Sequence, residues 1–379
     1  MKRVVLGALG CLLALGVLFH PSFIKNEIPL SQPERGIFQH GTKNQAAAAA
    51  AAADKAMQSP IPLLTDKEIA PPGGDKRDYT SLAVYYWPDA AKPDGKPYVR
   101  RDGQVNPEKW DETRYDAKRL VQMKNAVKAL ARGYAATGNK AYADRARAIA
   151  RAWFLDDATR MNPCLLYAQR IPGKTEGQKT GLIDTVNLID VVDSLYLLQD
   201  ACPAEEWQAY RQWFGAYTHW LLTSPLGRDE AASANNHGLW YDAQVCVFAH
   251  FAGQDETARK ILQAVPEKRM AVQIAEDGSL PLELARTRPL HYSLYTLRAC
   301  LTLARVGEEV GVPLYDAVSS NGRSLKLAID YILPYAKGEK ALPRKDIAKD
   351  DEAPFWHALH LANRHYHNPA YEYKPRQAD

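Results

Sequence analysis

Cysteine is scarce in this 379-residue chain, and its five cysteines lie too far apart to form a metal or redox motif. They contain no C-x-x-C pair and occupy positions Cys11, Cys164, Cys202, Cys246 and Cys300. This spacing does not favour a zinc site or a thiol redox centre. Runs of one charge are also absent, because no stretch of lysine or arginine exceeds two residues and the net charge is only +4. The charge pattern therefore does not indicate nucleic acid as a partner.

Long apolar runs are equally rare, and the one that exists lies near the N-terminus, from Val4 to Phe19. Lys2 and Arg3 precede it, and a basic start followed by a short apolar run is typical of a secretory signal. The run is short for a membrane-spanning helix, which needs about 20 residues. No A-x-A cleavage site follows, so an uncleaved anchor stays an alternative. We expect a signal peptide or N-terminal anchor over residues 1–25 and export to the periplasm.

The rest of the chain has the composition of a globular protein, with 46% hydrophobic and 24% charged residues. Residues 26–45 resemble a linker, and the alanine run from Ala46 predicts a first helix that Pro60 and Pro62 end. From Tyr115 onward, apolar residues recur every three or four positions, which is the period of an amphipathic helix. Helices are expected around residues 120–137, 142–153, 182–198, 207–221, 238–252, 255–265, 292–308 and 322–336.

Strand signals are sparse, and short turns that carry glycine or asparagine separate the helical stretches. Consecutive antiparallel helix pairs of this kind can form an open solenoid or a closed ring. No fixed repeat period is visible, which argues against a tetratricopeptide-type array. We therefore expect an all-α fold, with residues 46–379 forming a single α/α toroid, an incomplete barrel of antiparallel helix pairs.

Residues 70–110 interrupt the helical pattern with a long irregular segment near the N-terminus, rich in proline, glycine and aspartate. Its aromatic residues argue against disorder; they are Tyr79, Tyr85, Tyr86, Trp87 and Tyr98. Long ordered loops in compact domains are often functional. We expect this segment to form a sugar-binding wall over a cleft. The alternative is a strut that packs on the helix ends.

Two polar clusters are the main candidates for chemistry, and the polar-aromatic loop at residues 161–169 is a weaker third. The first is Asn235-Asn236-His237, followed by Trp240, which exceeds what a helix cap requires. The second runs from Glu283 through Arg286 and Arg288 to His291, Tyr292 and Tyr295. In this cluster we expect Glu283 to orient an arginine rather than to act as an acid.

These residue types suit the elimination chemistry of uronates better than hydrolysis, which normally uses two carboxylates across the scissile bond. The proton on C5 of a uronate becomes acidic once the adjacent carboxylate is neutralised. Amide, imidazole and guanidinium donors can stabilise the resulting enolate-like intermediate. A tyrosine whose pKa is lowered by nearby cations can take that proton and return one to the leaving O4.

The motifs that combine these groups resemble the alginate lyase superfamily, which includes mannuronate lyases and glucuronan-type lyases built on an α/α toroid. The resemblance spans about residues 65–335. It rests on Gly74-Asp75-Lys76, Tyr85-Tyr86-Trp87-Pro88-Asp89, Asp102–Pro107, Met161-Asn162-Pro163, Asn235-Asn236-His237 with Trp240, and Glu283-Leu284-Ala285-Arg286 followed by His291-Tyr292.

The resemblance implies catalytic roles for four residues. Tyr292 would remove and return the proton, while Asn236, His237 and Arg286 would neutralise the carboxylate, with His237 a second candidate for the base. Substrate contacts are expected from Lys76, Tyr79, Tyr86, Gln169, Trp240 and His291. The stretch between Arg286 and Tyr292 is one residue shorter than in mannuronate-specific lyases and contains Pro289, which leaves mannuronate and glucuronate both open.

The predicted function is a polysaccharide lyase that cleaves a polyuronate, either polymannuronate alginate or glucuronan, by metal-independent syn β-elimination. The expected product carries a 4,5-unsaturated uronate end. No cofactor is expected, the partner is the anionic polysaccharide, and the protein is expected to be a monomer without a membrane partner beyond the anchor. Two alternatives are an α/α-toroid glycoside hydrolase that uses Asp242 or Asp184 with Glu283, and a non-catalytic periplasmic polysaccharide-binding protein.

Overall fold

The computed structural model describes residues 43–348 and 351–372. The predicted signal or anchor and nearly all of the predicted linker lie outside these residues. Within them, no helix combines the length and the apolar character that a membrane crossing requires.

Helices make up most of the described chain, and four short strands accompany them. The α-helices are α2 (Lys43–Met57), α3 (Ala117–Thr137), α4 (Lys140–Phe154), α5 (Asn187–Leu197), α6 (Ala204–Thr223), α7 (Pro225–Ala231), α8 (Asn236–Phe251), α9 (Asp255–Val265), α10 (Ala271–Gln273), α11 (Pro281–Leu284), α12 (Pro289–Val310), α13 (Leu325–Ala336) and α14 (Ala353–Tyr366). The 3₁₀ and π segments are η1 (Leu64–Asp66), η2 (Pro107–Trp110), η3 (Lys179–Val186), η4 (Gln199–Ala201), η5 (Pro266–Met270) and η6 (Pro369–Tyr371). The strands are β1 (Thr80–Leu82), β2 (Tyr86–Trp87), β3 (Val99–Arg100) and β4 (Tyr167–Arg170).

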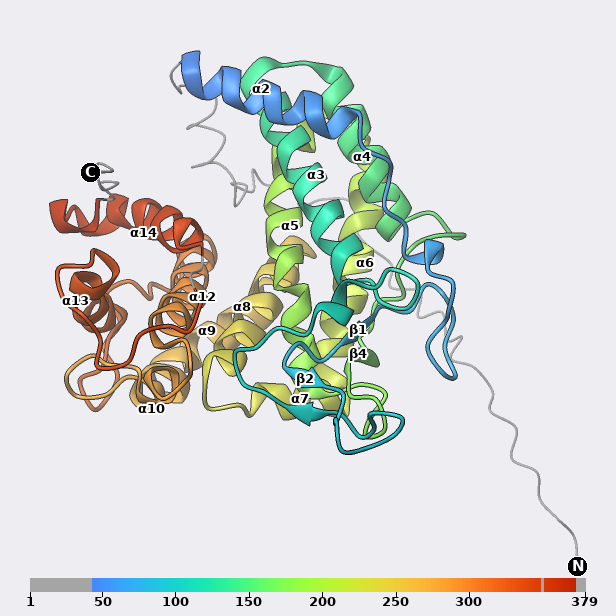
Figure 1. Cartoon of the computed structure of the whole chain (residues 1–379). Helices are drawn as coiled ribbons and strands as arrows, with labels where there is room; N and C mark the ends of the chain where they lie inside the picture. The colour runs from blue at the N-terminus through green and yellow to red at the C-terminus, as the bar shows by residue number, and fades with distance from the viewer. Residues whose placement is uncertain (1–42, 349–350, 373–379) are drawn as a thin grey trace, which may run out of the picture.

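The helices form two groups with α8 and α9 between them: α2 to α6 on one side, and α12 to α14 on the other (Figure 1). Helices that are close in the sequence pack together, as α3 does with α4 and α5, and α12 with α13 and α14. Helix α8 contacts α6, α9 and α12 and so connects the two groups. This arrangement is the expected all-α toroid, an incomplete barrel of antiparallel helix pairs.

Most predicted helices occur close to their expected positions. Helix α9 spans the predicted range, and α3 ends where Gly138 adopts a left-handed conformation with φ 71°. Helix α2 begins at Lys43, three residues before the alanine run and inside the range expected to be a linker. The helix expected over 182–198 is divided, because η3 ends at Val186 and α5 begins at Asn187. Helices α7, α10, α11 and α14 were not predicted.

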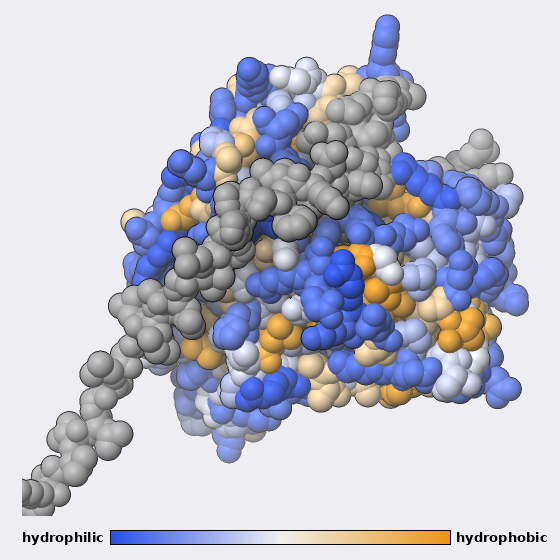
Figure 2. Space-filling view, turned by 180° about the vertical axis from the view of Figure 1, so that it is seen from behind, coloured by the Kyte–Doolittle hydropathy of each residue, from blue (hydrophilic) through white to orange (hydrophobic). Residues whose placement is uncertain are grey.

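The core is built around α8, in which every residue except His237 is buried. Aromatic side chains of α6 pack against it, as when the ring of Phe214 lies 5.2 Å from that of Phe248 and 5.3 Å from that of Phe251. A helix that is apolar on all sides needs neighbours on all sides, which is why α8 lies at the centre. At the surface seen in Figure 2, hydrophobic residues form small patches between hydrophilic ones.

The segment 70–110 is irregular but ordered, and it lies at one end of the helices together with β4 and α7 (Figure 1). Strand β1 pairs with β4 in parallel, and β2 pairs with β3 in antiparallel, with Tyr86 opposite Arg100. The β1–β4 sheet connects the segment to the region that follows α4, whereas the β2–β3 sheet lies within the segment itself. The segment thereby forms one wall of the cleft described next.

Candidate active site

A cleft of about 640 Å³ opens where the segment 70–110, the loop after β4 and the N-terminal ends of α8 and α12 meet. All four residues predicted to be catalytic line this cleft, namely Asn236, His237, Arg286 and Tyr292. Three of the six predicted substrate contacts line it as well, namely Tyr86, Gln169 and His291. The tertiary structure thus brings together groups that lie up to about 200 residues apart in the sequence.

Asn236 is held in place by Glu283 through two hydrogen bonds. The backbone N–H of Asn236 donates to Glu283 Oε1 at 2.7 Å, and its side-chain Nδ2 donates to Oε2 at 2.9 Å. Both residues are buried, and burial raises the pKa of the Glu283 carboxyl although the Asn236 donors lower it. Glu283 therefore orients Asn236, and the expectation that it orients an arginine is corrected.

His237 is oriented by a buried carboxylate on the preceding helix, α7. Its Nδ1 lies 2.5 Å from Oε1 of Glu230, which is 1% exposed. Glu230 also accepts a hydrogen bond from Ser233. Because Nδ1 is occupied, Nε2 is the ring nitrogen available to a substrate, and the carboxylate sets the orientation of the ring.

Arg286 links the segment 70–110 to Tyr292. Its Nε and Nη2 donate to the two oxygens of Asp102 at 3.2 and 2.9 Å, which is a two-point pairing of guanidinium and carboxylate. The same guanidinium lies 3.8 Å from the centroid of the Tyr292 ring. Asp102 therefore fixes the position of the cation that covers the phenol ring.

The hydroxyl of Tyr292 forms a hydrogen bond with the hydroxyl of Tyr85 from the opposite wall. Burial and the proximity of Tyr85 raise the pKa of Tyr292 above its ordinary value of 10, although Arg286 lowers it. The predicted lowering of this pKa is therefore wrong for the protein without substrate. The reason is that desolvation of the phenolate outweighs the attraction of a single nearby guanidinium.

His291 is a neutral side chain of the cleft at ordinary pH. Burial and the charges of Arg288 and Arg286 lower its pKa from 6.5 to about 4. Its ring stacks on Tyr295 with centroids 5.9 Å apart and meets the edge of Tyr292 at 5.0 Å. An uncharged imidazole can contact a polyanion as a hydrogen-bonding group but adds no positive charge.

Gln169 has a strained backbone at the edge of the cleft. Its φ is 51°, in a left-handed region that residues other than glycine rarely adopt. Its Nε2 donates to Asp184 Oδ1 at 2.9 Å, and its Oε1 accepts from Thr180 at 3.2 Å. Such strain persists only where the surroundings hold it, and it gathers at functional sites.

The other three predicted substrate contacts do not lie on the wall of this cleft. Tyr79 is 1% exposed, and its hydroxyl donates to Asp184 behind the wall. Trp240 is also 1% exposed and lies beneath Tyr295, with ring centroids 4.8 Å apart. Lys76 is exposed beside the surface pair of Asp75 and Arg77 and is not among the lining residues.

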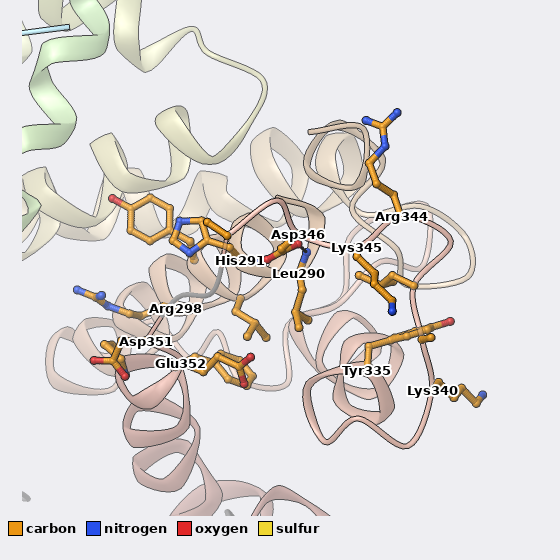
Figure 3. A pocket seen from close by; sticks show the side chains of 17 residues that line it. Leu290, His291, Arg298, Tyr335, Lys340, Arg344, Lys345, Asp346, Asp351 and Glu352 are labelled. Carbon is orange, nitrogen blue, oxygen red and sulfur yellow. Dashed lines mark hydrogen bonds between the residues drawn. The ribbon is translucent and has the colours of Figure 1, made fainter. Parts of the chain in front are cut away.

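A second pocket of about 540 Å³ shares His291 and Tyr295 with the cleft and lies between α12 and the segment that follows α13 (Figure 3). In it, Asp346 accepts hydrogen bonds from the backbone N–H groups of Leu290 and His291, both at 2.9 Å. A carboxylate at a helix N-terminus is favourable because the amides there are unpaired and carry partial positive charge. Asp346 thus anchors the first turn of α12, which carries Tyr292.

Sequence reasoning did not single out the residues that orient the candidate catalytic groups. The orienting residues are Tyr85, which bonds to Tyr292, together with Asp102, Glu230 and Asp346. The cleft is also lined by Arg100, Lys179 and Asn187, which sequence reasoning did not select. Asp102 and Tyr85 were quoted within motifs, but nothing in their spacing indicated which catalytic residue each would contact. The partners come from loops and helices far away in the sequence, so only the fold reveals them.

Comparison with known proteins shows which family this chain belongs to. The family model described as alginate lyase matches residues 63–342. A crystal structure of an alginate lyase from Bacteroides ovatus is 34% identical, with a TM-score of 0.85 over 90% of this chain and 93% of that one.

The chain belongs to the alginate lyase family.

More distant structures share the fold. Alginate lyase A1-III from Sphingomonas species A1 is 17% identical, with a TM-score of 0.56 over 88% of this chain and 92% of that one. A variant of alginate lyase A1-III complexed with a tetrasaccharide is 16% identical, with a TM-score of 0.62 over 92% of this chain and 95% of that one. No curated protein matches the chain.

Membership of the alginate lyase family makes this protein a polysaccharide lyase, and its carboxylates do not suit the hydrolase alternative. Asp242 is 1% exposed and accepts from Arg269 Nε at 2.6 Å, away from the cleft. Both oxygens of Glu283 bind Asn236, and Asp184 accepts from Tyr79, Ser81 and Gln169. These carboxylates serve to hold neighbouring side chains in place.

Proposed function

We propose that this polysaccharide lyase cleaves a polyuronate, polymannuronate alginate or glucuronan, by metal-independent syn β-elimination. The observation that carries the proposal is the convergence of Asn236, His237, Arg286 and Tyr292 on one cleft, each held by a separate partner. The product would be a 4,5-unsaturated uronate at the new non-reducing end. Export to the periplasm, expected from residues 1–25, is part of the same proposal.

The substrate carboxylate is proposed to bind between Asn236 and Arg286. Nδ2 of Asn236 uses one hydrogen for Glu283, and its second hydrogen is left to donate to the substrate. Arg286 supplies the positive charge, and Asp102 holds it in position. Groups oriented in advance towards developing negative charge lower the barrier without having to reorganise during the reaction.

The two proton transfers are assigned to two groups. The raised pKa of Tyr292 supports a phenol that donates a proton to the departing O4 more than one that is ionised beforehand. We assign removal of the C5 proton to His237, whose Nδ1 is held by Glu230 and whose Nε2 is left to accept the proton. Syn elimination requires both groups on the same face of the sugar, where mannuronate and glucuronate place H5 and O4 alike.

Within residues 43–348 and 351–372, no group of three or more His, Cys, Asp and Glu side chains has the geometry to hold a metal ion. The proposal assigns charge neutralisation to the protein's own side chains. It therefore predicts that a chelator leaves the rate unchanged, a point to be measured directly.

The test is to incubate the protein with polymannuronate, glucuronan and polyguluronate and to record the ultraviolet absorbance of the conjugated product. Elimination creates an absorbing C4–C5 alkene, hydrolysis creates reducing ends without it, and a binding protein creates neither. We expect absorbance with polymannuronate or glucuronan. Activity confined to polyguluronate, whose C5 configuration requires anti elimination, would contradict the syn mechanism.

A further inference from the structure

A second cavity of about 640 Å³ adjoins the cleft and shares Val186, Asn187 and Tyr295 with it. Its walls come from α3, α5, α12 and α14. We call it the basic chamber because cationic side chains outnumber carboxylates along its walls. The charged residues that define it are Lys124, Lys128, Arg132, Arg298 and Arg305, with Asp190, Asp193 and Asp351.

Three of the cations form one face of α3. Lys124, Lys128 and Arg132 are spaced four residues apart, so their side chains lie one above another along the helix. Like charges at this spacing destabilise an isolated helix. Lys124 and Lys128 keep only 17% and 29% of their side chains exposed. The α3 face of the chamber thus concentrates positive charge on partly buried side chains.

The carboxylates of the chamber do not neutralise this charge one for one. Asp190 is shared by Lys124 at 3.8 Å and Lys128 at 3.2 Å. Burial raises the pKa of Asp190, but the charges of Lys128, Arg298 and Lys124 outweigh burial and lower that pKa overall. Asp193 is occupied by both terminal nitrogens of Arg305 at 3.0 Å.

Arg298 is the cation best placed to bind an added anion. Its guanidinium lies 5.0 Å from the centroid of the Trp240 ring, and no described carboxylate forms an ion pair with it. Figure 3 shows Arg298 extending away from Lys340 and Lys345. Tyr295 and Arg298 are one helical turn apart on α12, and Tyr295 also borders the catalytic cleft. The path from Tyr292 to Arg298 therefore follows one face of α12.

Trp240 adds an independent observation. Its side chain lines the basic chamber and is 1% exposed, yet its Nε1–H has no hydrogen-bond partner among the described residues. Leaving a buried donor without a partner is unfavourable. The chamber thus holds a buried polar donor without a partner directly beneath Arg298.

We propose that the basic chamber binds the carboxylates of the uronate units next to the one that is cleaved, with Arg298 and Lys128 as the main ligands. The proposal rests on the polyuronate substrate proposed above. A polyuronate carries one carboxylate on every sugar, so a chain that crosses Tyr292 brings further carboxylates to the adjoining cavity. The excess of positive charge in the basic chamber would attract these carboxylates.

The experiment compares Arg298→Gln and Lys128→Gln with the wild type on uronate oligomers of increasing length. We expect KM for hexamers and longer chains to rise about tenfold, with kcat changed less than twofold. The loss should be no more than about threefold on the shortest oligomer that is cleaved. Lys260→Gln, an exposed lysine of α9 outside the chamber, is the matched control. An equal loss at every length, or no loss at any length, would overturn the proposal.

Calorimetric titration of a uronate hexamer into Tyr292→Phe separates this proposal from the proposed function. Binding that weakens about tenfold when Arg298→Gln or Lys128→Gln is added supports the chamber, even if no elimination product forms with the wild type. In that outcome the lyase mechanism fails and the binding site stands. Unchanged binding in both double variants removes the chamber while leaving the lyase mechanism intact. Two variants from different helices guard against misfolding of either one.

Discussion

Helices α8 and α12 pack against each other, and their two ends differ in what the polar side chains do. At the N-terminal ends, His237 and Tyr292 line the cleft. At the C-terminal ends, His250 of α8 contacts Glu309 of α12 at 3.3 Å and Asp255 at 2.7 Å. Both ring nitrogens of His250 are thus paired with carboxylates, whereas His237 has one nitrogen bound to Glu230 and the other left for a ligand.

The two ends also set opposite protonation states for their histidines. Burial lowers the pKa of His250, but Asp255 and Glu309 more than offset it and raise the pKa to about 9. His291, in the first turn of α12, has a pKa of about 4 because burial, Arg288 and Arg286 all disfavour its charge. The helix dipoles act in the same directions, since a C-terminus favours a cation and an N-terminus disfavours it. The carboxylate pairs of His250 therefore favour its charged form, whereas the surroundings of His291 favour its neutral form.

The largest expected effect is a loss of kcat when Tyr292, at the N-terminal end of α12, is changed. Tyr292→Phe keeps the ring under Arg286 and removes the proton that the proposed mechanism delivers to O4. We expect kcat to fall by about 10²–10⁴ with the melting temperature nearly unchanged. A uronate with a better leaving group at C4 should recover much of the rate, because it needs no acid. If the variant stays equally slow on both substrates, Tyr292 also serves as the base.

The next effect concerns His237. His237→Ala should lower kcat by about 10²–10³, and added imidazole should restore part of the rate if the side chain accepts the proton. The matched variant is His250→Ala, 13 residues further along α8, whose folded fraction should keep a wild-type kcat. Wild-type turnover in His237→Ala would show that the Asn-Asn-His cluster is only a helix cap.

Changes at the C-terminal ends of α8 and α12 should affect the stability of the protein rather than its catalytic rate. The pKa of His250 is raised in the folded state, so its contribution is complete below pH 6.5 and is lost as the pH rises through about 9. The shift corresponds to about 3 kcal/mol. His250→Gln should lower the free energy of unfolding at pH 6 and flatten its decline between pH 6 and 9.5 in urea titrations. An unchanged pH dependence in the variant would contradict the proposed pairing.

His291 should show the opposite pH dependence. Because its folded pKa is lowered to about 4, the stability of the protein should fall as the pH drops from about 6.5 towards 4. His291→Asn should reduce this acid sensitivity in the same urea titrations. Equal acid sensitivity in the two proteins would mean that His291 is not desolvated in solution.

The smallest expected effect concerns Lys76, which lies at neither end of the α8–α12 pair. The family resemblance predicts that it contacts substrate, but its exposed position beside Asp75 and Arg77 predicts a weak contribution. We expect Lys76→Ala to change KM less than twofold, against about tenfold for Arg298→Gln. A tenfold rise in KM for Lys76→Ala would show that the segment 70–110 moves towards the cleft when substrate binds.

The sequence allowed the helices and the candidate catalytic groups to be predicted because both depend on local patterns. The period of apolar residues predicted α9 over its full range, and Gly138 predicted the end of α3. Asn236, His237, Arg286 and Tyr292 were identified from residue type and family motifs. The division at Val186 was missed because 3₁₀ and α turns have similar sequence patterns.

The contacts of each candidate catalytic group were decided by the tertiary structure alone. Glu283 was expected to orient an arginine and instead binds Asn236, because α11 packs beside the start of α8. Tyr292 was expected to have a lowered pKa, but burial and Tyr85 from the opposite wall raise it. The basic chamber draws its cations from α3 and α12, which are more than 150 residues apart. Residue type and local period are properties of neighbours in the chain, whereas desolvation and charge pairing depend on distances that exist only after the helices have packed.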